Sequence, residues 1–308
     1  MSFLEFLGTM PGALNLGLIW AIAGIGVYIT FKILDIPDLT VDGSFITGGL
    51  VSSIIIINGG HFMLALLLGF IAGLLCGMVT GLLHTLLGIP AILAGILTQL
   101  ALWSVNLIIT KNKSIVSIPV ASYQTIMSQS NPYDALWKCA IIVGLIILVL
   151  YWFFGTKLGC SIRATGNNQK MSKAQGINTK LNIVIALALS NGIVGLSGAV
   201  YTQYYGMAEI NMGKGAIVIC LSAIVIGGLI FSKFAKNFAV RLSSVIVGSV
   251  IYYIIYQSVI NFGLEPNLMK LFTAIVVAIF LGIPYVKRHY IDGLAKRHQN
   301  RKIKSGGN

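Results

Sequence analysis

The sequence predicts an all-α, polytopic helical membrane protein with eight or nine transmembrane helices. Hydrophobic residues fill 56% of the 308 positions and charged residues only 9%, and the mean hydropathy is +0.90. Soluble domains carry about 25% charged residues. The apolar residues also come in long runs, each of which suits a bilayer crossing of about 20 residues. The short connectors between them leave no room for a separate soluble domain.

Nine apolar runs are candidates for these crossings. The second run, GSFITGGLVSSIIIIN, is short, rich in glycine and serine, and preceded by DIPDLTVD. We therefore expect it to form a tilted helix or a broken or re-entrant one, instead of a full crossing. The runs lie near 14–34, 43–58, 62–88, 90–110, 135–154, 181–203, 215–231, 238–258 and 267–286.

The positions of lysine and arginine predict the orientation. Fifteen of the 21 lie in three segments, which are 156–180, 232–241 and the tail after Val286. Positively charged loops are retained in the cytoplasm, so we expect all three segments there, and nine spans would place the N-terminus outside. The expected organisation is one transmembrane domain over 1–286 and a basic, disordered cytoplasmic tail over 287–308. We interpret the net charge of +13 as topology and contact with membrane lipids, not as nucleic-acid binding.

The acidic residues and motifs argue against ion coupling and catalysis. By the expected boundaries, none of the eight acidic residues lies in the middle of a span, where ion-coupled carriers usually need an ionisable or densely polar site. The sequence contains no HExxH, GxSxG or GxxxxGK[ST] motif, so we expect no catalytic residue and no ATP site in this chain. The four cysteines lack CxxC spacing and predict no metal site.

A stripe of glycines predicts close helix packing. In the run 62–88, glycine recurs every fourth residue and lays a smooth groove along one helix face, where another backbone can approach. We expect this groove to serve packing within one bundle, with a subunit interface as the alternative. The glycines interpreted in this way are Gly69, Gly73, Gly77, Gly81, Gly195 and Gly198.

Three amides inside the expected spans are candidates for the translocation pathway. A buried amide in lipid needs either a partner or a water-filled cavity. Asn191 is the first candidate because it lies beside glycines that let helices approach or separate, and Gln99 and Asn106 are the others. The alternative for each of them is an interhelical hydrogen bond.

The loop 156–180 carries five basic residues and no acidic one, and with the helix after it the loop resembles a family signature. The similar proteins are ABC importer permeases of the branched-chain amino acid and ribose type, in which R-A-x-G-x-N leads to A-x-x-G-I and then to a helix with S-x-x-x-x-G-x-x-G. A second run, GKGAIVICLSAIVIGG, also resembles the family, although Ser222 stands where alanine is usual. The positions that match the signature are Arg163, Ala164, Gly166, Asn168, Ala174, Gly176, Ile177, Ser190, Gly195 and Gly198.

The resemblance covers most of the chain from 40 to 285, and DIPDLTVDGSFITGG looks like a branch that includes tryptophan and tyrosine import systems. It implies a permease subunit in a bacterial cell membrane that forms the pathway for a small polar solute, with an amino acid, especially an aromatic one, ahead of a sugar or nucleoside. The implied partners are a cytoplasmic ABC ATPase, an extracytoplasmic solute-binding protein and a second permease subunit in a homodimer. The chain itself would bind no cofactor, since ATP and magnesium would sit on the ATPase.

The resemblance also implies a role for the loop 156–180. A short helix held outside the bilayer by its charge can dock in a groove of the ATPase and transmit motion as a rigid lever. Gly176 would allow a sharp turn at the end of that lever. The implied coupling residues are Arg163, Gly166, Asn168, Ala174, Gly176 and Ile177. The alternative function is a membrane scaffold or a stand-alone facilitator that is not coupled to an ATPase.

Overall fold

A computed structural model of the protein describes residues 3–119, 123–231 and 237–261, and beyond them Leu271, Ala274, Ile275, Ala278, Ile279 and Gly282. Backbone contacts divide the chain into two compact units, Met1–Ser258 and Val259–Asn308, and nearly all described residues belong to the first. Most of the ninth apolar run, residues 232–236, and the expected tail over 287–308 with its boundary lie outside the described residues.

The described residues confirm the all-α prediction, because each of the first eight apolar runs overlaps a helix. Within the described ranges, six helices are long and apolar enough to cross a membrane, and two apolar helices are shorter. Helix α1 (Phe3–Tyr28) continues into a π-helical turn, η1 (Ile29–Ile33). The other helices are α2 (Val41–Ile57), α3 (Phe62–Leu86), α4 (Ala91–Ile109), α5 (Pro132–Gly155), α6 (Lys157–Asn167), α7 (Gln169–Ala174), α8 (Thr179–Tyr205), α9 (Ala216–Ile230) and α10 (Phe238–Asn261).

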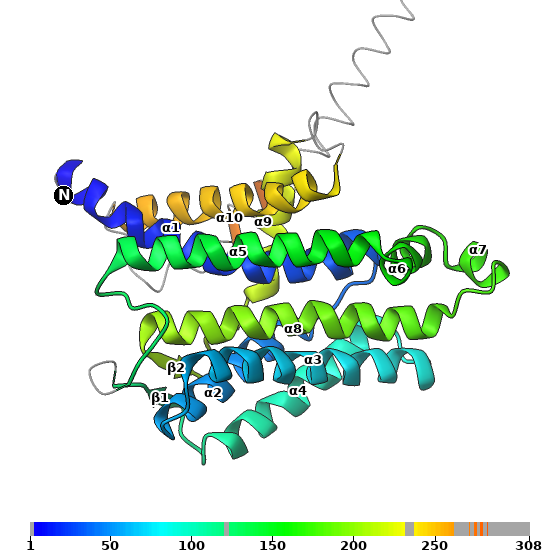
Figure 1. Cartoon of the computed structure of the whole chain (residues 1–308), viewed down its shortest axis with the longest axis horizontal. Coiled ribbons are helices and arrows are strands. Elements are labelled where there is room, and N and C mark those ends of the chain that lie inside the picture. The colour runs from blue at the N-terminus through cyan, green and yellow to red at the C-terminus, as the bar shows by residue number, and fades with distance from the viewer. Residues whose placement is uncertain are drawn as a thin grey trace, which may run out of the picture. The chain divides into compact units, whose positions relative to one another are not determined.

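Helix α8 forms the centre of the bundle (Figure 1). Within its most apolar window 78% of the residues are buried, against 22% in α5, so α8 is a core helix and α5 has a broad outer face. Helix α1 runs antiparallel to α8, and two serines of α8 hold the two helices together. Ser190 donates a hydrogen bond to the Gly26 carbonyl and Ser197 donates one to the Ile19 carbonyl, each at 2.7 Å.

The glycine stripe of α3 lies directly against α8. A Cβ atom at Gly73 would overlap the carbonyl of Asn191, and one at Gly77 would overlap the carbonyl of Leu187. On the α8 side, Gly195 faces Gly69 and Gly73 of α3, whereas Gly198 faces α2. The structure therefore places these glycines at contacts between helices of one chain, where the two backbones meet with no side chain between them.

The second crossing is broken, and the break precedes α2. Helix α2 runs parallel to α8, because Ser44 at its start contacts Asn191 and Ser52 near its end contacts Gln203. Asn191 lies next to the midpoint of α8. The chain thus reaches the middle of the bundle through the non-helical residues 35–40 before α2 begins. The apolar run itself forms the single short helix α2, and the non-helical segment before it favours a discontinuous crossing over a tilted one.

Helix α9 is also too short to cross alone, although the sequence predicted a span over 215–231. Its 15 residues rise about 22 Å, against a hydrocarbon core of about 30 Å. Figure 1 shows α9 lying steeply across the direction of α8 and α10. Its N-terminus is held by Asp42, whose carboxylate accepts hydrogen bonds from the Gly215 and Ile217 amides, both at 3.0 Å. The two short helices α2 and α9 are therefore joined at their N-termini.

The bundle has two distinct ends. At one end, β1 (Ile115–Ser117) pairs antiparallel with β2 (Met207–Glu209). At the other end lie α6, which packs beside the start of α8, and α7, which projects beyond the spans (Figure 1). The helices α6 and α7 lie in the basic loop 156–180, so the positive-inside rule predicts that their end faces the cytoplasm.

Cysteine labelling tests this orientation. In a background without other cysteines, single cysteines at positions Lys170, Lys236 and Lys302 should react only from the cytoplasmic side, whereas one at Lys113, beside β1, should react only from outside. Lys236 and Lys302 lie outside the described residues, so they test the sequence prediction alone. If an impermeant reagent added to intact cells labelled the Lys170→Cys variant, the loop would face the outside and the predicted orientation would be wrong.

Candidate functional site

The base of the loop 156–180 is fixed rigidly to the bundle. Helix α6 packs against the start of α8, where the side-chain amide of Asn182 donates hydrogen bonds to Ser161 at 2.6 Å and to Thr165 at 2.9 Å. On its other side, Gly166 meets the backbone of η1 so closely that a Cβ would overlap the Ile33 carbonyl. Gly166, one of the implied coupling residues, thus allows α6 and η1 to touch.

Arg163 ties α6 to the preceding helix. Its Nη2 donates hydrogen bonds to the carbonyl of Phe154, near the end of α5, at 2.9 Å and to the sulfur of Cys160 at 3.2 Å. The last carbonyls of a helix have no partner within the helix, and a basic side chain there satisfies one of them and stabilises the negative end of the helix dipole. Arg163 therefore joins α5 and α6 as one unit.

Helix α7, in contrast, is almost fully exposed, and Ser172 is its only buried residue. Asn168 caps its N-terminus by accepting a hydrogen bond from the Met171 amide at 3.0 Å. At the other end, Gly176 has a φ of +79°, a conformation that favours glycine, as the expected sharp turn requires. Ala174 and Gly176 are exposed and Ile177 is half-buried, so this part of the implied coupling set forms the tip of the loop.

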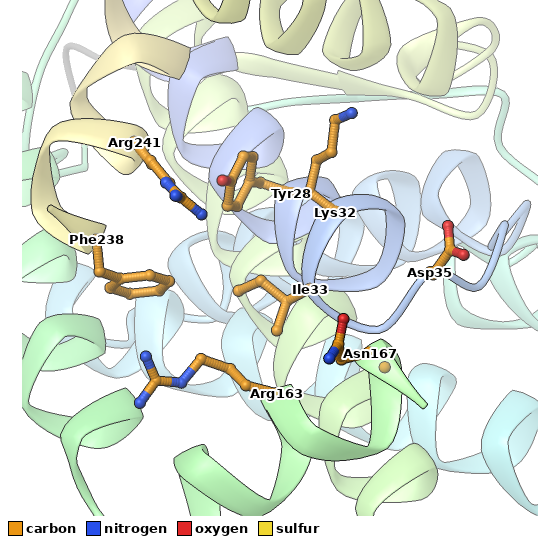
Figure 2. A pocket seen from close by; sticks show the side chains of 9 residues that line it. Tyr28, Lys32, Ile33, Asp35, Arg163, Asn167, Phe238 and Arg241 are labelled. Carbon is orange, nitrogen blue, oxygen red and sulfur yellow. The ribbon is translucent and has the colours of Figure 1, made fainter. Parts of the chain in front are cut away.

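An open cavity of about 530 Å³ lies between the rigid base and the neighbouring spans. Its walls come from α1 and η1, from α6, and from the start of α10 (Figure 2). The charged side chains that line it are Lys32, Asp35, Arg163 and Arg241. Arg163 thus belongs both to the loop and to this cavity.

A hydrogen-bonded polar cluster occupies the middle of the bundle around Asn191. The Asn191 side-chain nitrogen donates hydrogen bonds to Asp38 at 2.6 Å and to the Leu187 carbonyl at 3.0 Å, and its oxygen accepts one from Ser44 at 2.7 Å. The second oxygen of Asp38 accepts a hydrogen bond from the Thr40 amide at 2.9 Å. Both Asp38 and Asn191 are buried, so the cluster links the broken second crossing to α8.

The position of Asp38 corrects one sequence-based expectation. The expected boundaries placed every acidic residue outside the middle of a span, yet Asp38 lies beside the midpoint of α8. The error arises because residues 35–40 enter the bundle without forming a helix, and a hydropathy window cannot recognise such a segment. The nearest signal in the sequence was DIPDLTVD, which contains three carboxylates before a glycine-rich run.

The structure places the other two pathway candidates on α4. Gln99 is half-buried and lies beside Gly43 in the first turn of α2, on the flank of α2 that faces α4. Asn106 is buried, and its side-chain oxygen has no hydrogen-bond partner among the described residues. Asn191 and Gln99 therefore flank the start of α2 from two different helices, while Asn106 lies farther along α4.

A double-mutant cycle tests the polar cluster. Asn191→Leu should destabilise the purified chain by about 3 kcal/mol, because it leaves the buried Asp38 carboxyl without its Asn191 donor. Asp38→Leu combined with Asn191→Leu should recover much of this loss, since neither buried polar partner then remains. Thermal unfolding in detergent measures the stability of the wild type, the two single variants Asn191→Leu and Asp38→Leu, and the double variant. Losses that simply add in the double variant would contradict a direct interaction.

No group of three or more His, Cys, Asp and Glu side chains that could hold a metal ion occurs in the described part of the chain. Three features therefore stand out among the described residues: the cationic cavity, the buried polar cluster and the exposed tip of the loop 156–180.

The chain matches a known family over most of its length. The family described as "Branched-chain amino acid transport system / permease component" matches residues 10–282. A tyrosine transport system permease protein of Clostridioides difficile (strain R20291) is 35% identical over 264 residues, which cover 86% of this chain and 87% of that protein. An uncharacterized protein of Rickettsia prowazekii (strain Madrid E) is 31% identical over 268 residues, 86% of this chain and 92% of that protein.

A more distant relative is a sugar permease. The fructose import permease protein FruF of Bifidobacterium longum (strain NCC 2705) is 24% identical over 273 residues, which cover 87% of this chain and 75% of that protein. No solved structure matches the chain. The resemblance to ABC importer permeases, which was based on the loop 156–180 and the helix after it, therefore agrees with the family match over residues 10–282.

Proposed function

Because this chain belongs to the family of branched-chain amino acid transport system permease components, we propose that it forms the translocation pathway for an amino acid, and for an aromatic one first. The chain is a permease subunit of an ABC importer. The observation that carries the substrate class is its 35% identity, over 86% of its length, to a permease named for tyrosine transport. The 24% identity to a fructose import permease makes a sugar the second candidate.

The coupling site for the partner ATPase is proposed at the tip of the loop 156–180. An element that transmits motion needs a rigid base and an exposed contact surface. The contacts of Asn182, Gly166 and Arg163 provide the base. The exposed α7 provides the contact surface, with Met171 60% exposed. ATP and magnesium would be held by the ATPase, and this chain would bind neither.

The pathway is proposed to lie between two copies of the chain, with Asn191, Gln99 and Asn106 near it. In the described conformation Asn191 is fully buried and hydrogen-bonded, so a solute could reach it only after α2 moves away from α8. The non-helical residues 35–40 and the short α2 make such a movement less costly than bending a continuous helix. A homodimer with an extracytoplasmic solute-binding protein completes the proposed importer.

Co-purification and ligand identification test this proposal. The tagged chain should copurify with a partner ATPase when it is expressed together with any ATPase and solute-binding protein that neighbouring genes encode. The binding protein should retain an amino acid that mass spectrometry identifies. A sugar on the binding protein would overturn the amino acid assignment alone. Failure to find any ATPase with the chain would favour the stand-alone facilitator or scaffold.

A further inference from the structure

The cationic cavity beside the loop has an excess of positive charge. Three basic side chains line it, Lys32 from η1, Arg163 from α6 and Arg241 from α10, against the single carboxylate of Asp35. Among the described residues, Asp35 makes no ion pair with Lys32 or Arg163. Cations from three separate segments that line one open space repel each other, and a bound anion would relieve that repulsion.

Arg163 is oriented for such an anion. One of its terminal nitrogens, Nη2, is used by the Phe154 carbonyl and the Cys160 sulfur. Within the described part of the chain, its Nε and Nη1 have no hydrogen-bond partner, which leaves three N–H donors on a side chain whose position is already fixed. In the view of Figure 2, the side chains of Arg163, Phe238 and Arg241 lie at the same side of the cavity. Arginine is the residue best suited to hold phosphate oxygens through several donors.

The location of the cavity favours a lipid as the source of the anion. It lies where α1 ends and α10 begins, and both helices are candidate membrane spans, so their ends are expected to meet the headgroups. Tyr28 and Phe238 line it, and aromatic side chains are typical of this interface. Basic pockets between transmembrane helices on the cytoplasmic side are known to suit acidic headgroups. Its volume of about 530 Å³ lies within the range of about 300–1,000 Å³ of small-molecule sites.

We propose that this cavity binds a phosphate-bearing anion, supplied by the headgroup of an anionic phospholipid. Arg163 and Arg241 hold the phosphate oxygens, Lys32 adds positive charge at the rim, and Asp35 opposes binding. A bound headgroup joins α6 to η1 and α10 and so connects the base of the coupling loop to two spans. This inference rests on the proposed cytoplasmic orientation of the loop and does not depend on the ATPase or on the substrate.

Binding measurements on the delipidated full-length chain test the proposal. Native mass spectrometry with dioctanoyl phosphatidylglycerol should give a lower dissociation constant than with dioctanoyl phosphatidylcholine. Lys32→Gln and Arg241→Gln should each raise the phosphatidylglycerol dissociation constant about fivefold, and Asp35→Asn should lower it by a similar factor. Lys180→Gln is the matched control, because Lys180 is exposed at the same end but does not line the cavity. It should change the constant less than about twofold.

The outcomes separate the possible occupants. Inorganic phosphate could compete with phosphatidylglycerol, and the same variants could weaken the binding of phosphate. That result would support phosphate recognition and identify a soluble source of the anion. Equal phosphatidylglycerol affinity in the wild type, Lys32→Gln and Asp35→Asn proteins would overturn the proposal. If these variants instead changed ATPase binding and left phospholipid affinity unchanged, the cavity would belong to the ATPase docking surface, which also overturns it. Normal uptake in the variants would leave the proposed importer function intact in either case.

Discussion

Gly77→Leu should remove the folded protein from the membrane. A Cβ at this position already overlaps the Leu187 carbonyl of α8, and leucine adds three more carbons. The obstructing carbonyl belongs to the backbone of α8, so no side-chain rotation can relieve the overlap and α3 must move away from the central helix. We expect a loss of at least about 4 kcal/mol, which is the size of effect reserved for core disruption.

Gly144→Leu provides the matched control for this prediction. Gly144 lies on the outer face of α5, and no atom lies within 4 Å of the place that a Cβ would take there. Leucine on that face would only add apolar surface toward lipid, so the variant should insert and elute as the wild type does. Membrane abundance and size-exclusion profiles in detergent measure both variants. A Gly77→Leu protein that accumulates and elutes normally would show that the contact between α3 and α8 is not as close as described.

Gly176→Pro should leave the protein folded but abolish ATP-dependent uptake. Proline fixes φ near −65°, whereas Gly176 has a φ of +79° and donates its amide hydrogen to the Lys173 carbonyl at 3.0 Å. The turn is exposed, so its distortion costs little stability to a bundle of many helices. A displacement of about 1 Å at the tip can nevertheless prevent productive contact with a partner. Gly176→Asp should act in the same direction, and the ATPase should copurify less with both variants.

Gly88→Asp is the control that distinguishes a coupling defect from the general effect of replacing a glycine that has a positive φ. Gly88 is exposed, has a φ of +70° and, like Gly176, has open space where a Cβ would lie, so aspartate costs a similar amount at either position. It lies between α3 and α4, outside the loop 156–180, and its substitution should leave uptake unchanged. Arg163→Glu should weaken ATPase association by a smaller amount than Gly176→Pro. Wild-type uptake in both Gly176 variants, with the ATPase bound, would mean that the loop is only a solvated basic connector.

Much of the fold could be predicted from the sequence because it depends on local patterns. Each of the first eight apolar runs overlaps a helix in the structure. The four-residue glycine spacing from Gly69 to Gly81 predicted the helix face that packs closely against α8. The need for glycine at position 176 followed from the motif. The identity of the helix that fills the α3 groove could not be predicted in this way, since it depends on contacts between residues more than 100 positions apart, such as Gly77 and Leu187.

The polar core escaped prediction for a related reason. Whether a carboxyl group lies at membrane depth depends on where the backbone leaves and re-enters the bundle, and hydropathy assigns depth only to continuous helices. Inside the bundle, Asp38 accepts a hydrogen bond from Asn191, which is 153 residues away in the sequence. Asp42 likewise caps α9 through Gly215 and Ile217. For Asn191 the sequence left two alternatives, a pathway residue and an interhelical hydrogen bond, and the structure shows such a hydrogen bond, to Asp38, a partner that the sequence could not identify.

Transport by purified components in proteoliposomes tests the central claim most directly. Vesicles that contain this chain and the ATPase, supplied with the loaded solute-binding protein, should accumulate the amino acid only when ATP is present on the ATPase side. Vesicles that contain this chain alone should neither hydrolyse ATP nor accumulate the amino acid on an imposed proton or sodium gradient. Accumulation driven by such a gradient, in vesicles that contain only this chain, would contradict its assignment as the permease subunit of an ABC importer.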